Sequence, residues 1–134
     1  FNFQYFRNYI IGKNRIIKDL LMDQKFVSGL GNIYVNEVLF YSKVLPTKKI
    51  NQLVDEEIKI ILIIIKKILK KAIILGGSSI KNFSSSSGKS GAYQQHFAVY
   101  GKKGNPCSNT DCNKRIKKIF ISNRASFFCP KCQK

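Results

Sequence analysis

The sequence predicts a mainly α-helical chain that ends in a small β-hairpin closed by four cysteines. Apolar residues recur at helical spacing through much of 14–75, and short apolar runs flank a turn near the end of the chain. All four cysteines lie in that final part, as two close pairs. We therefore expect a helical domain at residues 1–93 and a hairpin domain with its lead-in at 94–134.

The first helix is expected to begin near Asn14. Residues 1–13 show no clean period, and their aromatic residues fit either a lead-in to a helix or the remnant of a linker. From Asn14 the apolar residues share one helical face. They are Ile16, Ile17, Leu20 and Leu21.

A second helix should follow the Ser-Gly-Leu-Gly-Asn stretch at 28–32. Asn32 is a suitable N-cap for a helix from Ile33 to about Ser42, and Pro46 would end this unit. The two glycines let a ligand approach the backbone closely, and the N–H groups of the helix start could bind an anion. A plain tight turn between two helices would carry the same residues, so both interpretations stay open.

The third helix, from Asp55 to Leu75, is the expected core helix. Its first turn is acidic and its end carries Lys70 and Lys71, as the helix dipole favours, and Gly76-Gly77 would stop it. Its isoleucines would also suit a strand, but the length and the end signals favour a helix. The apolar face contains Ile58, Ile61, Leu62, Ile65, Ile68, Leu69 and Ala72.

The serine- and glycine-rich stretch 84–91 cannot bury enough apolar area to order itself. We interpret it as a linker or as a mobile loop that orders on a ligand. The segment 93–100 is either a short helix or extended, and the glycine-rich turn 101–106 leads to the first cysteine.

The cysteines predict a zinc site. Cys107 and Cys112 form one pair, Cys129 and Cys132 the other, and sixteen residues lie between them. One Zn²⁺ is typically held by four such thiolates on a tetrahedron. Two disulfides or four unrelated thiols are the alternatives, but disulfides belong to oxidising compartments. His96 is the only histidine, and we expect it to be an ordinary surface side chain.

The residues between the cysteine pairs predict a hairpin with its turn at 122–124. The apolar residues on either side of the turn are Ile116, Ile119, Phe120, Ile121, Phe127 and Phe128.

The charge of the chain points to a polyanionic partner. The formal net charge is +17, from 24 basic and 7 acidic residues, and Asp111 is the one acidic residue beyond position 57. Nucleic acid is the favoured partner, since lysine and arginine gain affinity there by releasing counterions. Abundant Ile, Lys and Asn would also arise from an AT-biased genome, although the scarcity of acidic residues would not. Lys59, Lys66 and Lys67 bound the apolar run 60–65, which makes it too short for a membrane span.

Several motifs follow one another along the chain with ordinary loop lengths. They are Ile17–Lys25, Gly29–Tyr34 with Glu37, Leu39 and Phe40, Gly76–Phe83, Tyr100–Cys107, and Arg124–Lys134. Together they closely resemble motifs of bacterial formamidopyrimidine-DNA glycosylases, and the first two resemble the helix–two-turn–helix segment of that family.

The resemblance implies an enzyme that excises oxidised purines, such as 8-oxoguanine and formamidopyrimidines, and then cuts the abasic strand by β,δ-elimination. It implies that Asn32 holds a phosphate beside the lesion, with the Gly31 turn against the DNA backbone. Arg124 would grip the phosphates that flank the flipped nucleotide and donate a proton in δ-elimination, and Lys18 would lie near the lesion pocket. Further DNA contacts are expected from Lys81 and Tyr93, and the loop 84–91 would close over an everted base.

Two departures from the family pattern are visible. Four residues separate the first two cysteines where the family usually has two, which should bulge the knuckle without removing Cys112 as a ligand. The family's nucleophile is an N-terminal proline followed by glutamate, whereas this chain begins Phe1-Asn2. We therefore expect the DNA-binding C-terminal half of such an enzyme, without the β-rich catalytic domain and inactive in excision.

The expected partner is double-stranded DNA that contains oxidised bases or abasic sites, bound by a monomer in the bacterial cytoplasm and at the nucleoid. One alternative is a fragment of the related endonuclease VIII class, which prefers oxidised pyrimidines. The others are a non-enzymatic zinc-ribbon module that binds RNA and a zinc-stabilised protein-interaction domain.

Overall fold

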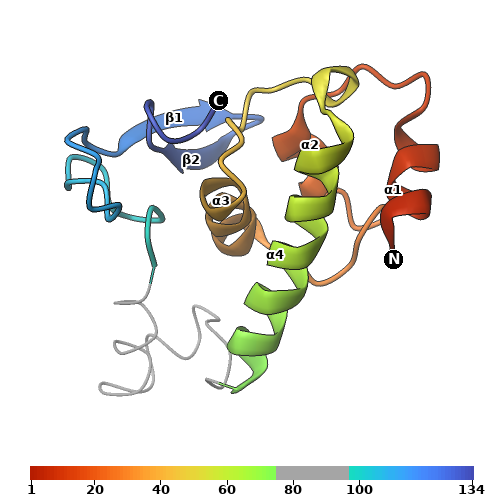
Figure 1. Cartoon of the computed structure of the whole chain (residues 1–134), viewed down its shortest axis with the longest axis horizontal. Coiled ribbons are helices and arrows are strands. Elements are labelled where there is room, and N and C mark those ends of the chain that lie inside the picture. Colours follow the sequence, from red (N-terminus) through yellow and green to blue (C-terminus); the bar gives the residue numbers. More distant parts are fainter. Residues whose placement is uncertain (75–96) are drawn as a thin grey trace.

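The computed structural model describes residues 1–74 and 97–134. This part of the chain is mainly helical and ends in a two-stranded antiparallel hairpin, which confirms the fold class at that level (Figure 1). The predictions for the Gly76-Gly77 stop, the loop 84–91, Lys81, Tyr93 and His96 lie outside the described residues. The elements are α1 (Phe3–Ile10), α2 (Ile17–Met22), α3 (Asn32–Tyr41), the 3₁₀-helix η1 (Ile50–Gln52), α4 (Asp55–Ile74), β1 (Lys117–Ile121) and β2 (Arg124–Phe128).

Helix α1 occupies the N-terminal stretch in which the sequence showed no period. The Asn2 side chain caps it by accepting a hydrogen bond from the N–H of Tyr5 (2.9 Å). Phe6, one turn before the helix end, is fully buried. Tyr5, Phe6 and Tyr9 all pack against the ring of Phe26. The aromatic residues of this stretch therefore belong to a helix that packs on the core.

Helix α4 is the core helix, as predicted, and it begins at Asp55. Its predicted apolar face is buried at Ile58, Ile61, Leu62, Ile65 and Ala72, and Ile68 and Leu69 are partly buried against the same core. The acidic first turn points away from this core at the surface. Burial of this face joins α4 to α1 and α3.

Helix α2 is shorter than predicted and begins at Ile17 rather than near Asn14. The residue before it is engaged elsewhere, since Ile16 forms an isolated antiparallel bridge with Lys49. The N–H of Ile17 donates to the carbonyl of Lys48 at 2.7 Å. This pairing with a distant segment keeps the backbone extended up to the helix start.

Two predictions for α3 are wrong. Asn32 is the first helical residue and not the N-cap, which is Gly31, and no side chain caps this helix. Pro46 does not end the unit, because Tyr41 is already the last helical residue and Lys43 adopts the left-handed conformation (φ 62°). A left-handed residue just past the last turn stops a helix by itself.

The hairpin has the predicted turn. Ser122 and Asn123 both have positive φ (51° and 63°), the conformation that a two-residue turn needs to match the twist of the strands. The strands pair from Ile121 with Arg124 to Lys117 with Phe128. Arg124 is thus the first residue of β2, directly after the turn.

Helix α3 contributes to the two larger hydrophobic cores of the described chain. Its Val35, Val38 and Leu39 lie in the helical core. Phe40 lies in a second, smaller core under the hairpin. Figure 1 shows α3 between the hairpin and α4. In the described part of the chain, no helix is long and apolar enough to cross a membrane.

Candidate nucleic-acid interface and metal centre

Strand β2 is fastened to the helices by polar side chains along its outer edge. The carbonyl of Ala125 accepts hydrogen bonds from the amide nitrogens of Asn32 (3.0 Å) and Asn36 (3.4 Å) and from Lys18 Nζ (3.5 Å). The N–H of Phe127 donates to Asn36 Oδ1 at 2.6 Å. One strand edge therefore aligns side chains from α2 and α3.

Lys18 is a buried amine at this junction. Its side chain is 1% exposed, and its Nζ donates to Ser126 Oγ at 2.6 Å. Burial, followed by the positive charge of Arg124, lowers the pKa of Lys18 to about 8, against an opposing effect of Asp19. Close to neutral pH this amine can therefore lose or gain a proton.

The structure brings Lys18, Asn32 and Arg124, three of the residues singled out from the sequence, to the same end of the hairpin. Asn32 and Lys18 both donate to the Ala125 carbonyl. Arg124, the residue before Ala125, is exposed. The turn is also tied to α2, since Ser122 Oγ donates to Asp19 Oδ1 at 2.9 Å. The predicted contacts Lys81 and Tyr93 are outside the described residues.

The two glycines before α3 differ in whether the backbone conformation calls for a glycine. Gly29 has a φ of 96°, which favours glycine in any fold. Gly31 has an ordinary φ of −94°, and a Cβ built there would meet nothing within 4 Å in the described chain. Nothing in the described part of the fold therefore requires a glycine at position 31.

Asn36 was missed by the sequence reasoning. It is 2% exposed, and its amide both donates to and accepts from the backbone of β2 while also donating to the carbonyl of Asn32 (2.8 Å). The available signal was a polar residue one helical turn after Asn32, among apolar neighbours.

Glu37 fastens the segment that leads into the hairpin domain. Its buried carboxylate accepts hydrogen bonds from the N–H groups of Ala98 (2.7 Å), Val99 (3.0 Å) and Tyr100 (3.0 Å). Burial raises the pKa of Glu37, and the three N–H groups act in the opposite direction. The sequence marked Glu37 as a motif residue without a structural role.

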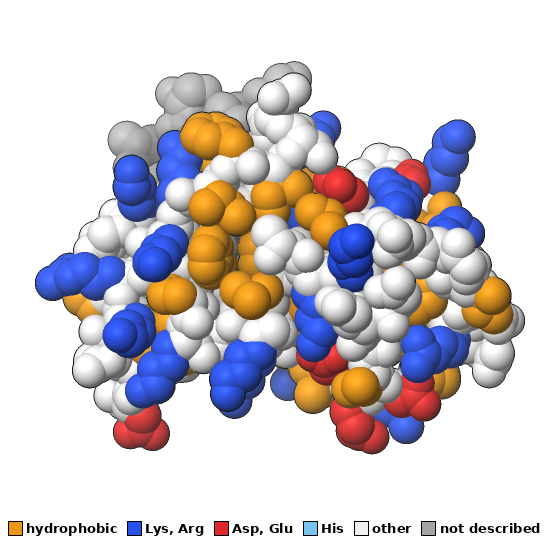
Figure 2. All heavy atoms as spheres, turned by 90° about the horizontal axis from the view of Figure 1, so that it is seen from above, with side chains coloured by type: hydrophobic (Ala, Val, Ile, Leu, Met, Phe, Trp, Pro, Cys, Tyr) orange, Lys and Arg blue, Asp and Glu red, His pale blue; other side chains and the backbone are white. Residues whose placement is uncertain are grey.

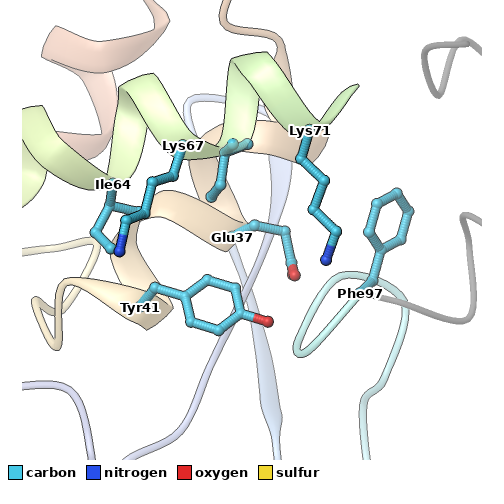
Figure 3. Close-up of a pocket in the computed structure, with 7 residues that line it drawn as sticks. Glu37, Tyr41, Ile64, Lys67, Lys71 and Phe97 are labelled. Carbon is cyan, nitrogen blue, oxygen red and sulfur yellow. The ribbon is translucent and has the colours of Figure 1, made fainter. Parts of the chain in front are cut away.

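A hollow of about 300 Å³ lies beside Glu37, between α3 and α4. Figure 3 shows Lys67 and Lys71 reaching from α4 into the space that Glu37 and Tyr41 face from α3, with Phe97 closing one side. Burial raises the pKa of the Tyr41 phenol, and the charge of Glu37 adds to that.

The four cysteines form a cluster that could hold a metal ion. Their sulfur atoms all lie within 4.8 Å of one another, with Cys107 and Cys132 at 3.8 Å and Cys112 and Cys129 at 3.6 Å. Zinc–thiolate bonds of about 2.3 Å on a tetrahedron place sulfurs about 3.8 Å apart, whereas a disulfide needs about 2 Å. The donor set fits a tetrahedral metal, and the longer spacer leaves Cys112 in place.

The protonation of these thiols depends on their surroundings. Burial raises the pKa of Cys107 to about 12 and also raises that of Cys129, which favours the neutral thiol at both positions. A backbone hydrogen bond from Lys114 lowers the pKa of Cys112 to about 7. A bound metal cation would favour the thiolate form of all four.

Gln133 links the metal cluster to the helical part. Its Oε1 accepts from the N–H of Cys129 (2.8 Å), and its Nε2 donates to the carbonyl of Val44 (2.9 Å). The side chain is 1% exposed, so both bonds are shielded from water. Asn109 adds a further contact, because its amide donates a hydrogen bond to the sulfur of Cys132 (3.1 Å).

Basic side chains are widespread on the surface of the chain. Figure 2 shows Lys and Arg side chains scattered around a central group of hydrophobic side chains, with acidic side chains on the right and at the lower edge. An excess of basic side chains at the surface favours a polyanionic partner.

Comparisons with known proteins agree with the resemblance seen in the sequence. Residues 1–84 match the family described as "Formamidopyrimidine-DNA glycosylase H2TH domain". The formamidopyrimidine-DNA glycosylase of Listeria monocytogenes serotype 4b is 46% identical over 121 residues, covering 90% of this chain and 44% of its own length. That of Bacillus subtilis is 46% identical over 134 residues, covering 99% of this chain and 48% of its own length.

Solved structures give the same result. A complex between the Lactococcus lactis Fpg and DNA that contains an abasic site superposes with a TM-score of 0.88 at 43% identity, covering 100% of this chain and 48% of that one. A complex of the same enzyme with DNA that contains Fapy-dG gives a TM-score of 0.87. The chain spans about half the length of the relatives it matches. By its matched domain and its fold, the chain belongs to the formamidopyrimidine-DNA glycosylase family.

Proposed function

We propose that this chain is the DNA-binding half of a bifunctional DNA glycosylase/AP lyase of base excision repair. The intact enzyme would remove oxidised purines, including 8-oxoguanine and formamidopyrimidines, and cut the abasic strand by β,δ-elimination. One observation carries the proposal: Lys18, Asn32 and Arg124, which the family resemblance assigns to DNA, come from three elements and meet at one end of the hairpin. Relatives bound to abasic-site DNA support it.

In this proposal the start of α3 holds a phosphate beside the lesion. Asn32 uses one amide hydrogen for Ala125, and the second remains for a phosphate oxygen. The N–H groups of the first turn point the same way, as helix starts do toward anions. The bare Gly31 lets the DNA backbone approach.

Arg124 supplies the second grip. A guanidinium binds phosphate through two parallel hydrogen bonds, and the exposed position of Arg124 beside the turn leaves its fork free to do so. By the family resemblance it also donates a proton in δ-elimination. Lys18, with its lowered pKa, would stand at the edge of the lesion pocket.

The arrangement of α2 and α3 supports the helix–two-turn–helix assignment. The two helices pack against each other and are joined by the 23–31 turn segment, which also contains Gly29. We propose residues 1–93 as this DNA-binding module and 94–134 as the hairpin module that closes on the same DNA.

We further propose that the metal is one structural Zn²⁺. Cys107, Cys112, Cys129 and Cys132 would fill its four positions, which leaves no open site for catalysis. Zinc would offset two of the four thiolate charges and fix the hairpin. The contacts to DNA would come from the residues of the chain and not from the metal.

The excision step is expected to need more than these 134 residues, because they span about half the length of the curated relatives that they match. By themselves these residues should bind lesion DNA without releasing the base.

The test is a binding titration of the zinc-loaded chain against a duplex with one stable abasic-site analogue and against the same duplex undamaged, at two salt concentrations. We expect tighter binding to the abasic duplex and a steep salt dependence. Equal affinity for abasic duplex, intact duplex and RNA would instead identify a general nucleic-acid module. Weak, salt-independent binding would remove nucleic acid as the partner.

A further inference from the structure

We propose that the hairpin tip contacts DNA with both of its faces. In this inference Phe120, together with Lys118, packs against the strand opposite the one that Arg124 holds. The inference rests on the proposed function and adds a residue pair and a second strand to it.

Phe120 is the observation that starts the argument. Its side chain is 70% exposed, well above the other exposed aromatic residues of the described chain, of which Tyr41 reaches 45%. A single exposed apolar residue needs no explanation by itself. An exposed phenyl ring at the end of a proposed binding element, however, offers a flat apolar surface for a base or a sugar.

The ring is held in place rather than free. Lys118 Nζ lies 5.1 Å from the centre of the Phe120 ring and 5.7 Å from that of Phe127. Phe127 is buried and packs edge-on against Tyr100, with ring centres 5.1 Å apart. A row of rings with a lysine between them therefore runs from the hairpin core out to Phe120, and it orients both a cation and an apolar face before any ligand binds.

The strand register puts this row and Arg124 on opposite faces. Phe120 pairs with Ala125, whereas Arg124 pairs with Ile121, and successive residues of a strand point to opposite sides. Near the turn, the ribbon therefore carries Arg124 on one face and the Phe120–Lys118 pair on the other. A β-ribbon that enters a DNA groove has one strand of the duplex on each side.

The charges along the hairpin fit this position. The hairpin and its lead-in carry Lys114, Arg115, Lys117 and Lys118 besides Arg124. Asp19 is the acidic side chain tied to the turn, through the hydroxyl of Ser122. Basic side chains therefore outnumber it along the ribbon, and the balance of charge favours approach to phosphates.

Phe120→Ala tests the inference directly, with Phe120→Trp as the variant that keeps a ring. The control is Ile11→Ala, because Ile11 is equally exposed (71%) but lies at the end of α1. Zinc content and the far-ultraviolet circular dichroism of each variant show that the fold is kept. The probes are the duplex with a stable abasic-site analogue and the lesion-bearing single strand alone.

We expect Phe120→Ala to raise the duplex Kd about tenfold, which is the scale of one lost stacking contact, while Phe120→Trp and Ile11→Ala bind as the unchanged chain does. The single-strand Kd should stay the same. The salt slope should not change for Phe120→Ala, but Lys118→Gln should reduce it by about 0.9.

An unchanged duplex Kd for Phe120→Ala overturns the inference. An equal loss on the single strand also overturns it, since Phe120 would then touch the strand that Arg124 holds. The proposed function fails separately, if the unchanged chain does not prefer the abasic duplex or if Asn32→Ala and Arg124→Ala leave its Kd unaltered.

Discussion

The helical part and the hairpin part of this chain are held together by different physics. Eighteen buried apolar residues form one continuous core among the helices. The core under the hairpin has six buried members, of which two are cysteines and one, Phe40, belongs to α3. The hairpin therefore has little apolar burial of its own, and the sulfur cluster, which could hold a metal, and the polar bonds to α3 provide its further links.

This difference suits the proposed function. Asn32, Asn36 and Glu37 lie on one helix, and each reaches across to the hairpin region. A stable helix thus sets the position of a ribbon that could not position itself. The predictions below disturb one part at a time, beginning with the largest expected effect.

Cys129→Ser should unfold the hairpin and leave the helices folded. Cys129 is fully buried in the sulfur cluster, and binding of structural zinc contributes about 10–16 kcal/mol of apparent free energy in small zinc modules. Zinc content should fall, and DNA affinity should be lost with it, while most of the helical circular dichroism remains. A variant that kept both zinc and DNA affinity would contradict the metal assignment.

Ile61→Ala should destabilise the helices and leave the hairpin with its metal site. Ile61 is fully buried at the centre of the α4 face, and truncation of such a residue costs about 2–5 kcal/mol of unfolding free energy. Chemical denaturation should show that loss, with zinc still bound at low denaturant. The matched control is Ile63→Ala on the same helix, because Ile63 is 54% exposed and should change stability little. Equal losses from both would mean that α4 does not bury the face described above.

Asn36→Ala should weaken the connection between the two parts. It leaves the N–H of Phe127 without its acceptor in a buried position, which costs about 1–3 kcal/mol. Hydrogen exchange at β2 should speed up more than exchange at α4, and DNA affinity should fall because the β2 edge that Asn32 binds is held less firmly. Gln4→Ala is the control, since its amide makes an exposed bond to Asn8 within α1. Uniform acceleration across both parts would show that Asn36 stabilises the fold as a whole.

DNA affinity should fall as pH rises through about 8. In the free chain Lys18 loses its proton through a pKa of about 8. A nearby phosphate favours the charged amine and raises that pKa, so binding takes up a proton above this pH and affinity is full below it. The decline should not exceed about tenfold in Kd per pH unit for one group. Lys18→Arg keeps its charge and should remove the pH dependence; if the decline persisted in that variant, another group would be responsible.

The sequence was sufficient to predict the elements that depend on a regular apolar face or on the spacing of the cysteines. Helix α4 follows a regular apolar stripe, and the cysteine pairs define the metal cluster in spite of the longer spacer at Cys112. The sequence was not sufficient where the role of a residue depends on a partner far away in the chain. Asn32 has the residue type of an N-cap, yet its amide is used 93 positions away on Ala125. Gln133 gave no signal, because its role depends on the distant Val44 carbonyl.

Gly31→Ala should have the smallest effect on the fold and is therefore the cleanest test of where DNA lies. The φ of Gly31 suits alanine, and an added Cβ meets no atom of the described chain within 4 Å. Alanine is a poorer N-cap than glycine, but it also reduces the freedom of the unfolded chain, and these opposing effects are each below about 1 kcal/mol. The melting temperature should hardly move. If the DNA backbone approaches Gly31 closely, the new methyl group should still weaken binding to the abasic duplex severalfold, and that loss without a change in stability would locate the DNA at the start of α3. An alanine variant with unchanged affinity would place the backbone farther out and leave Asn32 and Arg124 as the contacts that hold it.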